Sequence, residues 1–155
     1  YEVARHFMGK NYIKPEKEEL KKMLDPMTFA VTQEDETERP HSSPLDTHFE
    51  EGIYVDAVSG EPLFSSRDKY DAGCGWPSFT QPIGRDVLTA HRDRKLGALR
   101  TEIRSATANS HLGHVFNDGP QEKTGLRYCL NGAALRFVPK ADMIKEGYSD
   151  YMQYV

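Results

Sequence analysis

One of the two cysteines of this 155-residue chain lies in a short apolar segment between two polar side chains. If the pentapeptide RYCLN at residues 127–131 is a strand, alternation places Arg127, Cys129 and Asn131 on one face. A guanidinium beside a thiol favours the thiolate, which is the nucleophilic form of cysteine. The segment therefore makes Cys129 a candidate nucleophile. Taken alone, it favours the alternative, a small buried residue on a core strand, as most free cysteines are.

The second cysteine, Cys74, lies in the heptapeptide GCGWPSF at residues 73–79. Glycines on both sides permit unusual backbone angles and leave the thiol accessible, as a redox partner requires. Trp76 is the only tryptophan, and an indole face near a thiol could hold the methyl group of a thioether or sulfoxide. The alternative is a turn whose Trp76 and Phe79 fill the core.

Two histidines and an aspartate lie within eight positions of the segment SHLGHVFNDGP, residues 110–120. The imidazoles of His111 and His114 can move protons near neutral pH, and the carboxylate of Asp118 can fix a tautomer. Each histidine alone is more often structural, but the grouping indicates acid–base chemistry. A metal site at the histidine pair would need a third ligand, and none has an obvious spacing.

Together these segments supply a thiol, its cation, proton donors, a methyl site and a second thiol, which is the equipment for thiol-based reduction. The three motifs, with LRF at residues 135–137, closely resemble those of the methionine-R-sulfoxide reductases of the B type and occur in the same order. The resemblance runs from about Lys17 to Val155.

The resemblance implies a reaction in which Cys129 attacks the sulfoxide sulfur, releases methionine and becomes a sulfenic acid. Cys74 then resolves the sulfenic acid to a disulfide, which thioredoxin reduces. It also implies that Trp76 holds the substrate methyl group. The residues that would orient and protonate the sulfoxide oxygen are His111, His114, Asp118, Arg127 and Asn131.

The chain departs from the family pattern at three places. Many members hold a zinc ion with two CxxC pairs, but the corresponding positions here are Asp56, Ser59, Ser105 and Ala108. The resemblance therefore places the chain in the zinc-free subgroup, with no metal and no other cofactor. Gly132 stands where serine is common, and residues 41–48 lack the aromatic side chains associated with this segment.

Two short helices are predicted near the N-terminal side. Pro15 suits a first helical position, and Leu20, Met23 and Leu24 follow at the spacing of one helix face. The Asp25-Pro26 pair predicts a second helix that runs through Phe29. Residues 32–49 are polar and contain two prolines, so they are predicted to be a solvated loop.

The rest of the chain predicts a mainly β fold with an antiparallel core. Residues 99–104 alternate cleanly, with Leu99 and Ile103 on a buried face and the charged residues on a wet one. A short C-terminal helix over residues 140–146 would end at Gly147. The resemblance implies two antiparallel sheets with short N-terminal helices. The strands are predicted at residues 53–57, 63–64, 99–104, 114–116, 128–131 and 133–138.

Length and composition predict one globular domain, with 37% hydrophobic and 28% charged residues. We assign residues 11–155 to a single catalytic domain and residues 1–10 to a linker or an expression remnant. The net charge of −4 and the pI near 5.9 argue against a nucleic-acid partner. The sequence has neither a run long enough for a membrane span nor a secretory signal.

The expected partners are thioredoxin and oxidised proteins or peptides that contain methionine-R-sulfoxide, with the chain acting as a monomer. We predict a cytoplasmic location, or an extracytoplasmic one if the chain is a fragment, for instance of a fusion to the reductase for the opposite epimer. The alternative function is a redox-responsive binding module in which Cys74 and Cys129 switch a surface. Selective consumption of one sulfoxide epimer would distinguish the enzyme from the switch.

Overall fold

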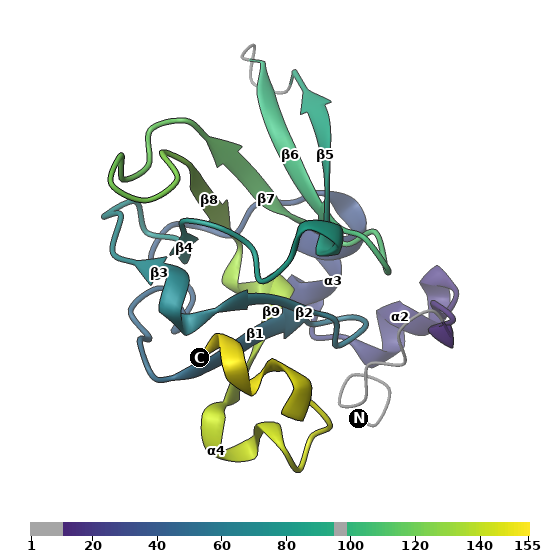
Figure 1. The fold of residues 1–155 in the computed structure, drawn as a ribbon. Coiled ribbons are helices and arrows are strands. Elements are labelled where there is room, and N and C mark those ends of the chain that lie inside the picture. Colours follow the sequence, from purple (N-terminus) through teal and green to yellow (C-terminus); the bar gives the residue numbers. More distant parts are fainter. Residues whose placement is uncertain (1–10, 95–98) are drawn as a thin grey trace.

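Two antiparallel sheets form the framework of the computed structural model, which describes residues 11–94 and 99–155 (Figure 1). The larger sheet has the order β3-β4-β8-β7-β6-β5, and the smaller has the order β2-β1-β9. The predicted mainly β fold with two antiparallel sheets is confirmed. The strands are β1 (Gly52–Asp56), β2 (Pro62–Ser65), β3 (Lys69–Tyr70), β4 (Ser78–Phe79), β5 (Leu88–Asp93), β6 (Arg100–Ser105), β7 (His111–Phe116), β8 (Arg127–Leu130) and β9 (Leu135–Pro139).

Short helices lie at both ends of the described chain. The first two are α2 (Lys17–Met23) and α3 (Pro26–Glu34), and α4 (Lys140–Met143) precedes the 3-10 turn η6 (Ser149–Tyr154). The backbone N–H of Met27 donates to Asp25 Oδ2 at 3.1 Å, which caps α3 as the sequence predicts. This helix continues past its predicted end to Glu34, whereas α4 ends earlier than predicted. In the described part of the chain, none of the helices is long and apolar enough to cross a bilayer.

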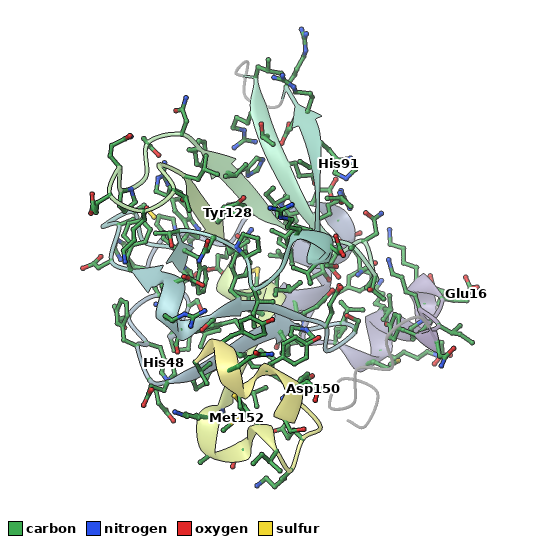
Figure 2. The ribbon with its side chains drawn as sticks, in the orientation of Figure 1. Glu16, His48, His91, Tyr128, Asp150 and Met152 are labelled. Atoms are coloured by element: carbon green, nitrogen blue, oxygen red, sulfur yellow. The ribbon has the colours of Figure 1, made fainter. Side chains whose placement is uncertain are left out.

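Strand β1 is buried on both faces and links two packed layers. Tyr54 points into the core between the sheets, whereas Ile53 and Val55 face the opposite side and pack with Met143 and Tyr148. The C-terminal segment that carries α4 and Met152 covers this outer face (Figures 1 and 2). The core between the sheets is formed by Val31, Tyr54, Leu63, Phe64, Phe79, Ile103, Leu112, Leu130, Ala134 and Leu135.

The polar segment 32–49 is not a uniformly solvated loop. Thr32 lies within α3, and Glu38 is only 2% exposed. The Glu38 carboxylate accepts hydrogen bonds from the backbone N–H groups of Gly132 and Ala133, each at 2.9 Å. Burial raises the pKa of Glu38, and these two hydrogen bonds oppose the rise. The loop prediction is confirmed for residues 36–49 but was wrong for residues 32–34, which belong to α3, and for Glu38. The charge of Glu38 can be buried because backbone donors satisfy it.

The alternation along β6 was predicted correctly, but its charged face was wrongly expected to be exposed to solvent. Ile103 is buried as predicted, but Leu99 is 55% exposed and lies just before the strand. On the polar face, Glu102 and Arg104 are partly buried and make ion pairs. Strand β5, which pairs with β6 alone, was missed because its side chains are mostly exposed and show no apolar face.

A buried carboxylate joins the two sheets. Asp56, at the end of β1, accepts hydrogen bonds from Ser105 Oγ at 2.6 Å, Ser110 Oγ at 3.1 Å and the backbone N–H of Val58 at 2.8 Å. Burial raises the pKa of Asp56, and these hydrogen bonds lower it in part. The three donors lie in the core with the carboxylate as their shared acceptor, so they depend on it.

The variant Asp56→Ala should therefore lose roughly 2 to 4 kcal/mol of unfolding free energy, because its buried donors are left without an acceptor. The matched variant Asp56→Asn keeps an acceptor oxygen without the buried charge and should lose less than half as much. Urea denaturation of the three proteins measures both differences. An equal loss in the two variants would contradict the assigned role of this carboxylate.

Candidate active site

A cavity of about 260 Å³ opens beside the central strand β8. It gathers most of the site residues that the sequence predicts, together with Thr37, Arg100 and Phe116, which the sequence did not single out. The predicted residues on its wall are Cys74, Trp76, His114, Arg127, Cys129 and Asn131. The predicted residues that do not line it are His111 and Asp118.

Cys129 owes its position to the register of three strands. On β8 it pairs with Ser78 of β4 on one side and with His114 of β7 on the other. Side chains opposite each other in an antiparallel ladder lie on the same face, so the thiol has a histidine and a hydroxyl as neighbours. The predicted alternation is confirmed, since Arg127, Cys129 and Asn131 reach the same cavity.

Cys74 is held beside Cys129 by the loop formed by residues 73–75. The two flanking glycines have φ angles of 71° at Gly73 and 91° at Gly75, in the left-handed region that the sequence predicts they would permit. The Gly75 carbonyl accepts a hydrogen bond from His41 N–H at 2.7 Å. As a result, Cys74 Sγ lies 3.9 Å from Cys129 Sγ and 3.4 Å from Ser78 Oγ.

The two thiols differ in acidity, because the pKa of Cys74 is lowered and that of Cys129 is raised. Burial, followed by the nearby Cys74, raises the pKa of Cys129 to about 12, and the charge of Arg127 only partly opposes them. Burial also works against ionisation of Cys74, but hydrogen bonds, first of all with Ser78, outweigh it and lower the pKa. Arg127 favours the Cys129 thiolate as predicted, but burial and the neighbouring Cys74 outweigh its effect.

Asp118 positions the arginine rather than a histidine. Its carboxylate accepts two hydrogen bonds from Arg127, at 2.9 Å from Nε and 3.1 Å from Nη2. This pairing lowers the pKa of Asp118, and the guanidinium also lies 4.4 Å from the centre of the Phe116 ring. The expectation that Asp118 fixes a histidine tautomer is therefore not met. The bidentate pair and the ring fix the guanidinium on the cavity wall.

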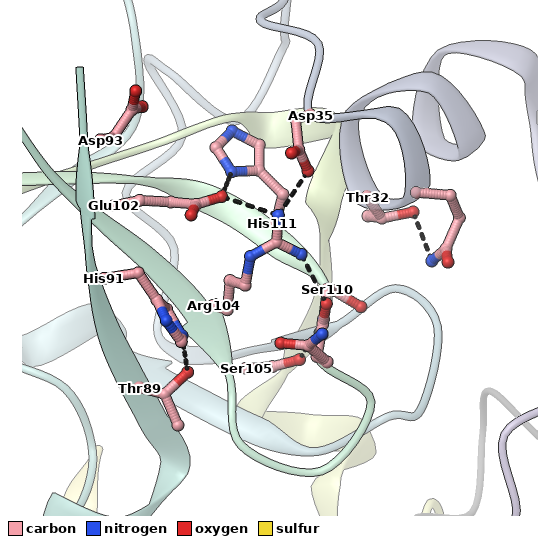
Figure 3. Close-up of polar contacts among 12 residues, drawn as sticks. Thr32, Asp35, Thr89, His91, Asp93, Glu102, Arg104, Ser105, Ser110 and His111 are labelled. Carbon is pink, nitrogen blue, oxygen red and sulfur yellow. Dashed lines mark hydrogen bonds and ion pairs between the residues drawn. The ribbon is translucent and has the colours of Figure 1, made fainter. Parts of the chain in front are cut away.

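His111 does not line the cavity and belongs to a network of charged side chains (Figure 3). Its Nδ1 lies 2.6 Å from Glu102 Oε2, and Arg104 Nη2 lies 2.9 Å from the same oxygen and 2.6 Å from Asp35 Oδ1. Burial lowers the pKa of His111, so the neutral ring donates its Nδ1–H to Glu102. Asp35, Glu102 and His111 could form a metal-binding group, but the guanidinium of Arg104 already binds both carboxylates.

His114 has its own acidic partner, from β5. Its Nε2 lies 2.8 Å from Asp93 Oδ2, and Arg100 Nη2 lies 3.2 Å from the same oxygen. Sequence reasoning missed Asp93 because β5 was not predicted. Glu102 could have been found, because it pairs across the β6–β7 ladder with His114, and recognising that hairpin would have placed the charged face of β6 next to the histidines.

The wall opposite β7 is built from the segment around Glu38. Trp76 Nε1 donates to the Glu38 carbonyl oxygen at 3.0 Å, and Asn131 Oδ1 accepts from the Glu38 N–H at 2.9 Å. Asn131 Nδ2 also donates to the Leu112 carbonyl at 2.9 Å. The Asn131 amide thus ties this segment to β7, and the indole is fixed by the same segment.

Gly132 and the segment 41–48, which both depart from the family pattern, lie against each other. A Cβ atom on Gly132 would lie 1.9 Å from Ser43 Oγ and 2.5 Å from Ser43 Cβ, which is too close for any side chain. The unusual segment 41–48 therefore packs where a serine at position 132 would project. Gly132 and Ser43 are best understood as a matched pair.

The comparison with known families agrees with this geometry. A family model for the SelR domain matches residues 24–139, a range that contains both cysteines and every residue of the cavity. The chain belongs to the SelR-domain family. This SelR domain is the methionine-R-sulfoxide reductase B domain, and its enzyme class is peptide-methionine (R)-S-oxide reductase. The resemblance stated from the motifs is confirmed at the level of family and activity.

The positions at which many SelR domains hold zinc do not fit that ion here. Asp56 and Ser105 are hydrogen-bonded at 2.6 Å, and Ser59 is also a hydrogen-bond partner of the Asp56 carboxylate. Ala108 packs in an apolar cluster with Leu20. Zinc is bound by thiolates, imidazoles and carboxylates, and these four positions supply a single carboxylate, which the serine hydroxyls already occupy.

At pH 7, iodoacetamide should modify Cys74 of the reduced protein before Cys129, because the thiolate is the reactive form and Cys74 ionises first. Peptide mass spectrometry over a time course measures both rates. The variant Ser78→Ala removes the main hydrogen bond to Cys74 and should slow its labelling. Faster labelling of Cys129 than of Cys74 would overturn the assigned order of acidity.

The variant Gly132→Ser should lose roughly 1 to 3 kcal/mol of stability, as expected of overpacking, because the new side chain collides with Ser43. Adding Ser43→Gly removes the colliding atoms and should restore most of the loss. Thermal unfolding of the two single variants and the double variant gives the coupling energy. Additive losses, with no recovery in the double variant, would show that the two positions are independent.

Proposed function

We propose that this domain reduces methionine-R-sulfoxide with Cys129 as nucleophile and Cys74 as resolving thiol, and that thioredoxin regenerates it. The observation that carries the proposal is the 3.9 Å separation of the two sulfur atoms at the wall of one cavity. A disulfide is about 2.05 Å long, so the sulfur atoms need to close by only about 1.9 Å after the first reaction.

In the first step, Cys129 Sγ attacks the sulfoxide sulfur and forms a sulfur–sulfur bond, while the proton of the thiol passes to the sulfoxide oxygen. The protonated oxygen then moves from the substrate sulfur to Cys129 Sγ as the sulfur–sulfur bond breaks. This leaves Cys129 as a sulfenic acid and releases methionine, so the substrate sulfur is reduced and Cys129 is oxidised by two electrons. Because its pKa is raised, Cys129 is mostly a thiol rather than a thiolate at pH 7. The attack must therefore be coupled to proton transfer, which the sulfoxide oxygen also needs in order to leave.

His114 is the group best placed to relay that proton, because it lines the cavity and pairs across the ladder with Cys129. Arg127 would stabilise negative charge as it forms on Cys129, since its charge partly opposes the rise that burial causes in the pKa of that thiol. Trp76 would hold the methyl group of the substrate through its indole face. The remaining predicted residues act through these: Asp118 through Arg127, His111 through His114, and Asn131 through the wall that carries Trp76.

In the second step, the Cys74 thiolate attacks Cys129 Sγ and displaces the sulfenic oxygen, which leaves as water once it is protonated. The lowered pKa of Cys74 favours this step, because the attacking sulfur must be ionised. A dithiol such as thioredoxin then exchanges with the disulfide and returns both cysteines to thiols. Oxidised proteins or peptides are the proposed substrates.

Further features belong to the same proposal. We infer that the domain works without zinc or another cofactor, since the donor set at Asp56 does not fit that ion. Residues 11–155 would act as one catalytic unit and as a monomer. The apolar clusters support a single unit, because they join Leu20 of the first helices and Tyr148 of the C-terminal segment to the two sheets.

Replacing each cysteine separates the two steps. Cys129→Ser should reduce sulfoxide consumption to the level of a protein-free blank. Cys74→Ser should give about one methionine per enzyme in a single turnover but no thioredoxin-driven cycling, because only the resolving step is lost. Chromatographic quantification of methionine measures both.

The same assay carries its own controls. The wild-type protein should consume the R epimer and leave the S epimer intact, which a redox switch without a shaped site would not do. Sustained turnover by Cys129→Ser would eliminate the proposed nucleophile, and unimpaired thioredoxin-driven cycling by Cys74→Ser would eliminate the proposed resolving thiol.

A further inference from the structure

We propose that Asp93, held by Arg100, is a positioning residue that fixes the orientation and tautomer of His114 for proton delivery into the cavity. The proposal rests on the proposed function, because it assumes that His114 supplies the proton. It adds a part of the molecule that the sequence motifs do not contain, the edge hairpin formed by β5 and β6. The structural basis is the chain of contacts from Arg100 through Asp93 to the imidazole.

The contacts from Arg100 through Asp93 hold the His114 ring in one orientation, as a general acid requires. His114 Nε2 lies 2.8 Å from Asp93 Oδ2, which as a carboxylate oxygen accepts the Nε2–H. With Nε2 engaged, Nδ1 is the ring nitrogen left for a substrate oxygen. Arg100 Nη2, at 3.2 Å, holds the same carboxylate oxygen and also lines the cavity. The imidazole side chain is only 10% exposed, so its orientation depends on these partners.

A comparison of the two histidines shows which carboxylate contact can affect the cavity. His111 also has a carboxylate partner, Glu102, but that pair does not line the cavity and is neutralised by Arg104. His114 is the histidine on the cavity wall. Only the contact with Asp93 therefore bears directly on a proton that can reach a substrate.

Charged and titratable groups surround His114 on several elements. The sign of each charge determines whether it favours or disfavours protonation of the imidazole. Those that face it or act on it through a neighbour are Asp93 of β5, Arg100 and Glu102 of β6, His111 of β7, Cys129 and Arg127 of β8, Cys74 of the 73–75 loop and Asp35 at the end of α3. Removing a negative charge from this set should disfavour the imidazolium, and removing a positive charge should favour it.

The test combines NMR titration of His114 with single-turnover kinetics on the full chain. Nitrogen-15 shifts report which ring nitrogen carries the proton, and a His114→Asn sample identifies the signal. Wild-type protein should show the Nε2–H tautomer. In Asp93→Asn the midpoint of the His114 titration should fall, the preference for this tautomer should weaken, and methionine formation should slow at least about tenfold.

Three further variants test the direction of the charge effect and provide a control. Arg100→Gln should move the midpoint upward, opposite to Asp93→Asn, whereas simple loosening of the hairpin would not move the two in opposite directions. Asp93→Glu keeps the charge and should recover part of the rate. Arg92→Gln removes an exposed charge from the neighbouring position of β5 and should change neither readout.

An unchanged midpoint, tautomer and rate in folded Asp93→Asn would overturn the inference. The same holds if Asp93→Asn and Arg100→Gln shift the midpoint in one direction. These outcomes leave the proposed function intact, provided that wild-type protein still forms methionine and Cys129→Ser does not. If wild-type protein forms no methionine, the proposed function fails, while the NMR arm still tests the contact between Asp93 and His114.

Discussion

The site depends on the central position of β8 in an antiparallel sheet, because one ladder register places Cys129 between Ser78 of β4 and His114 of β7. The three residues are far apart in the sequence, and backbone hydrogen bonds between strands hold them together. The same register fixes Cys74 indirectly, since its sulfur contacts the Ser78 hydroxyl. A shift of one residue in the register of β8 would turn Cys129 to the other face of the sheet, so the site residues would no longer be neighbours.

Buried carboxylates hold the elements around this sheet. Glu38 binds the backbone at residues 132 and 133 and carries the wall on which Trp76 is fixed, while Asp56 joins the ends of β1 and β6. Glu102 and Asp93 contact the two histidines. Each carboxylate is partnered by donors or a cation, which is the condition under which a charge can be buried at modest cost. The framework thus consists of polar contacts as much as apolar packing.

The sequence predicted the fold class, most strands and six of the residues that line the cavity, because these leave local signals: alternation in β6, glycines around Cys74, and three motifs shared with a known family. It missed Glu38, Asp93 and Glu102, since the roles of these side chains arise from tertiary pairing with residues far along the chain. The sequence also did not show that burial outweighs the effect of Arg127 on the Cys129 thiol. A neighbouring arginine is visible in the sequence, but the depth of burial that raises the pKa of Cys129 is not.

The central claim is that sulfoxide reduction and disulfide formation are one coupled process at Cys129 and Cys74. The most direct test is to react the reduced wild-type protein, without a reductant, with the R epimer of a methionine sulfoxide peptide and to count products. The account predicts one methionine per protein molecule, with the loss of both thiols and the appearance of a peptide pair joined through Cys74 and Cys129. Methionine formed while both thiols stay reduced would contradict it.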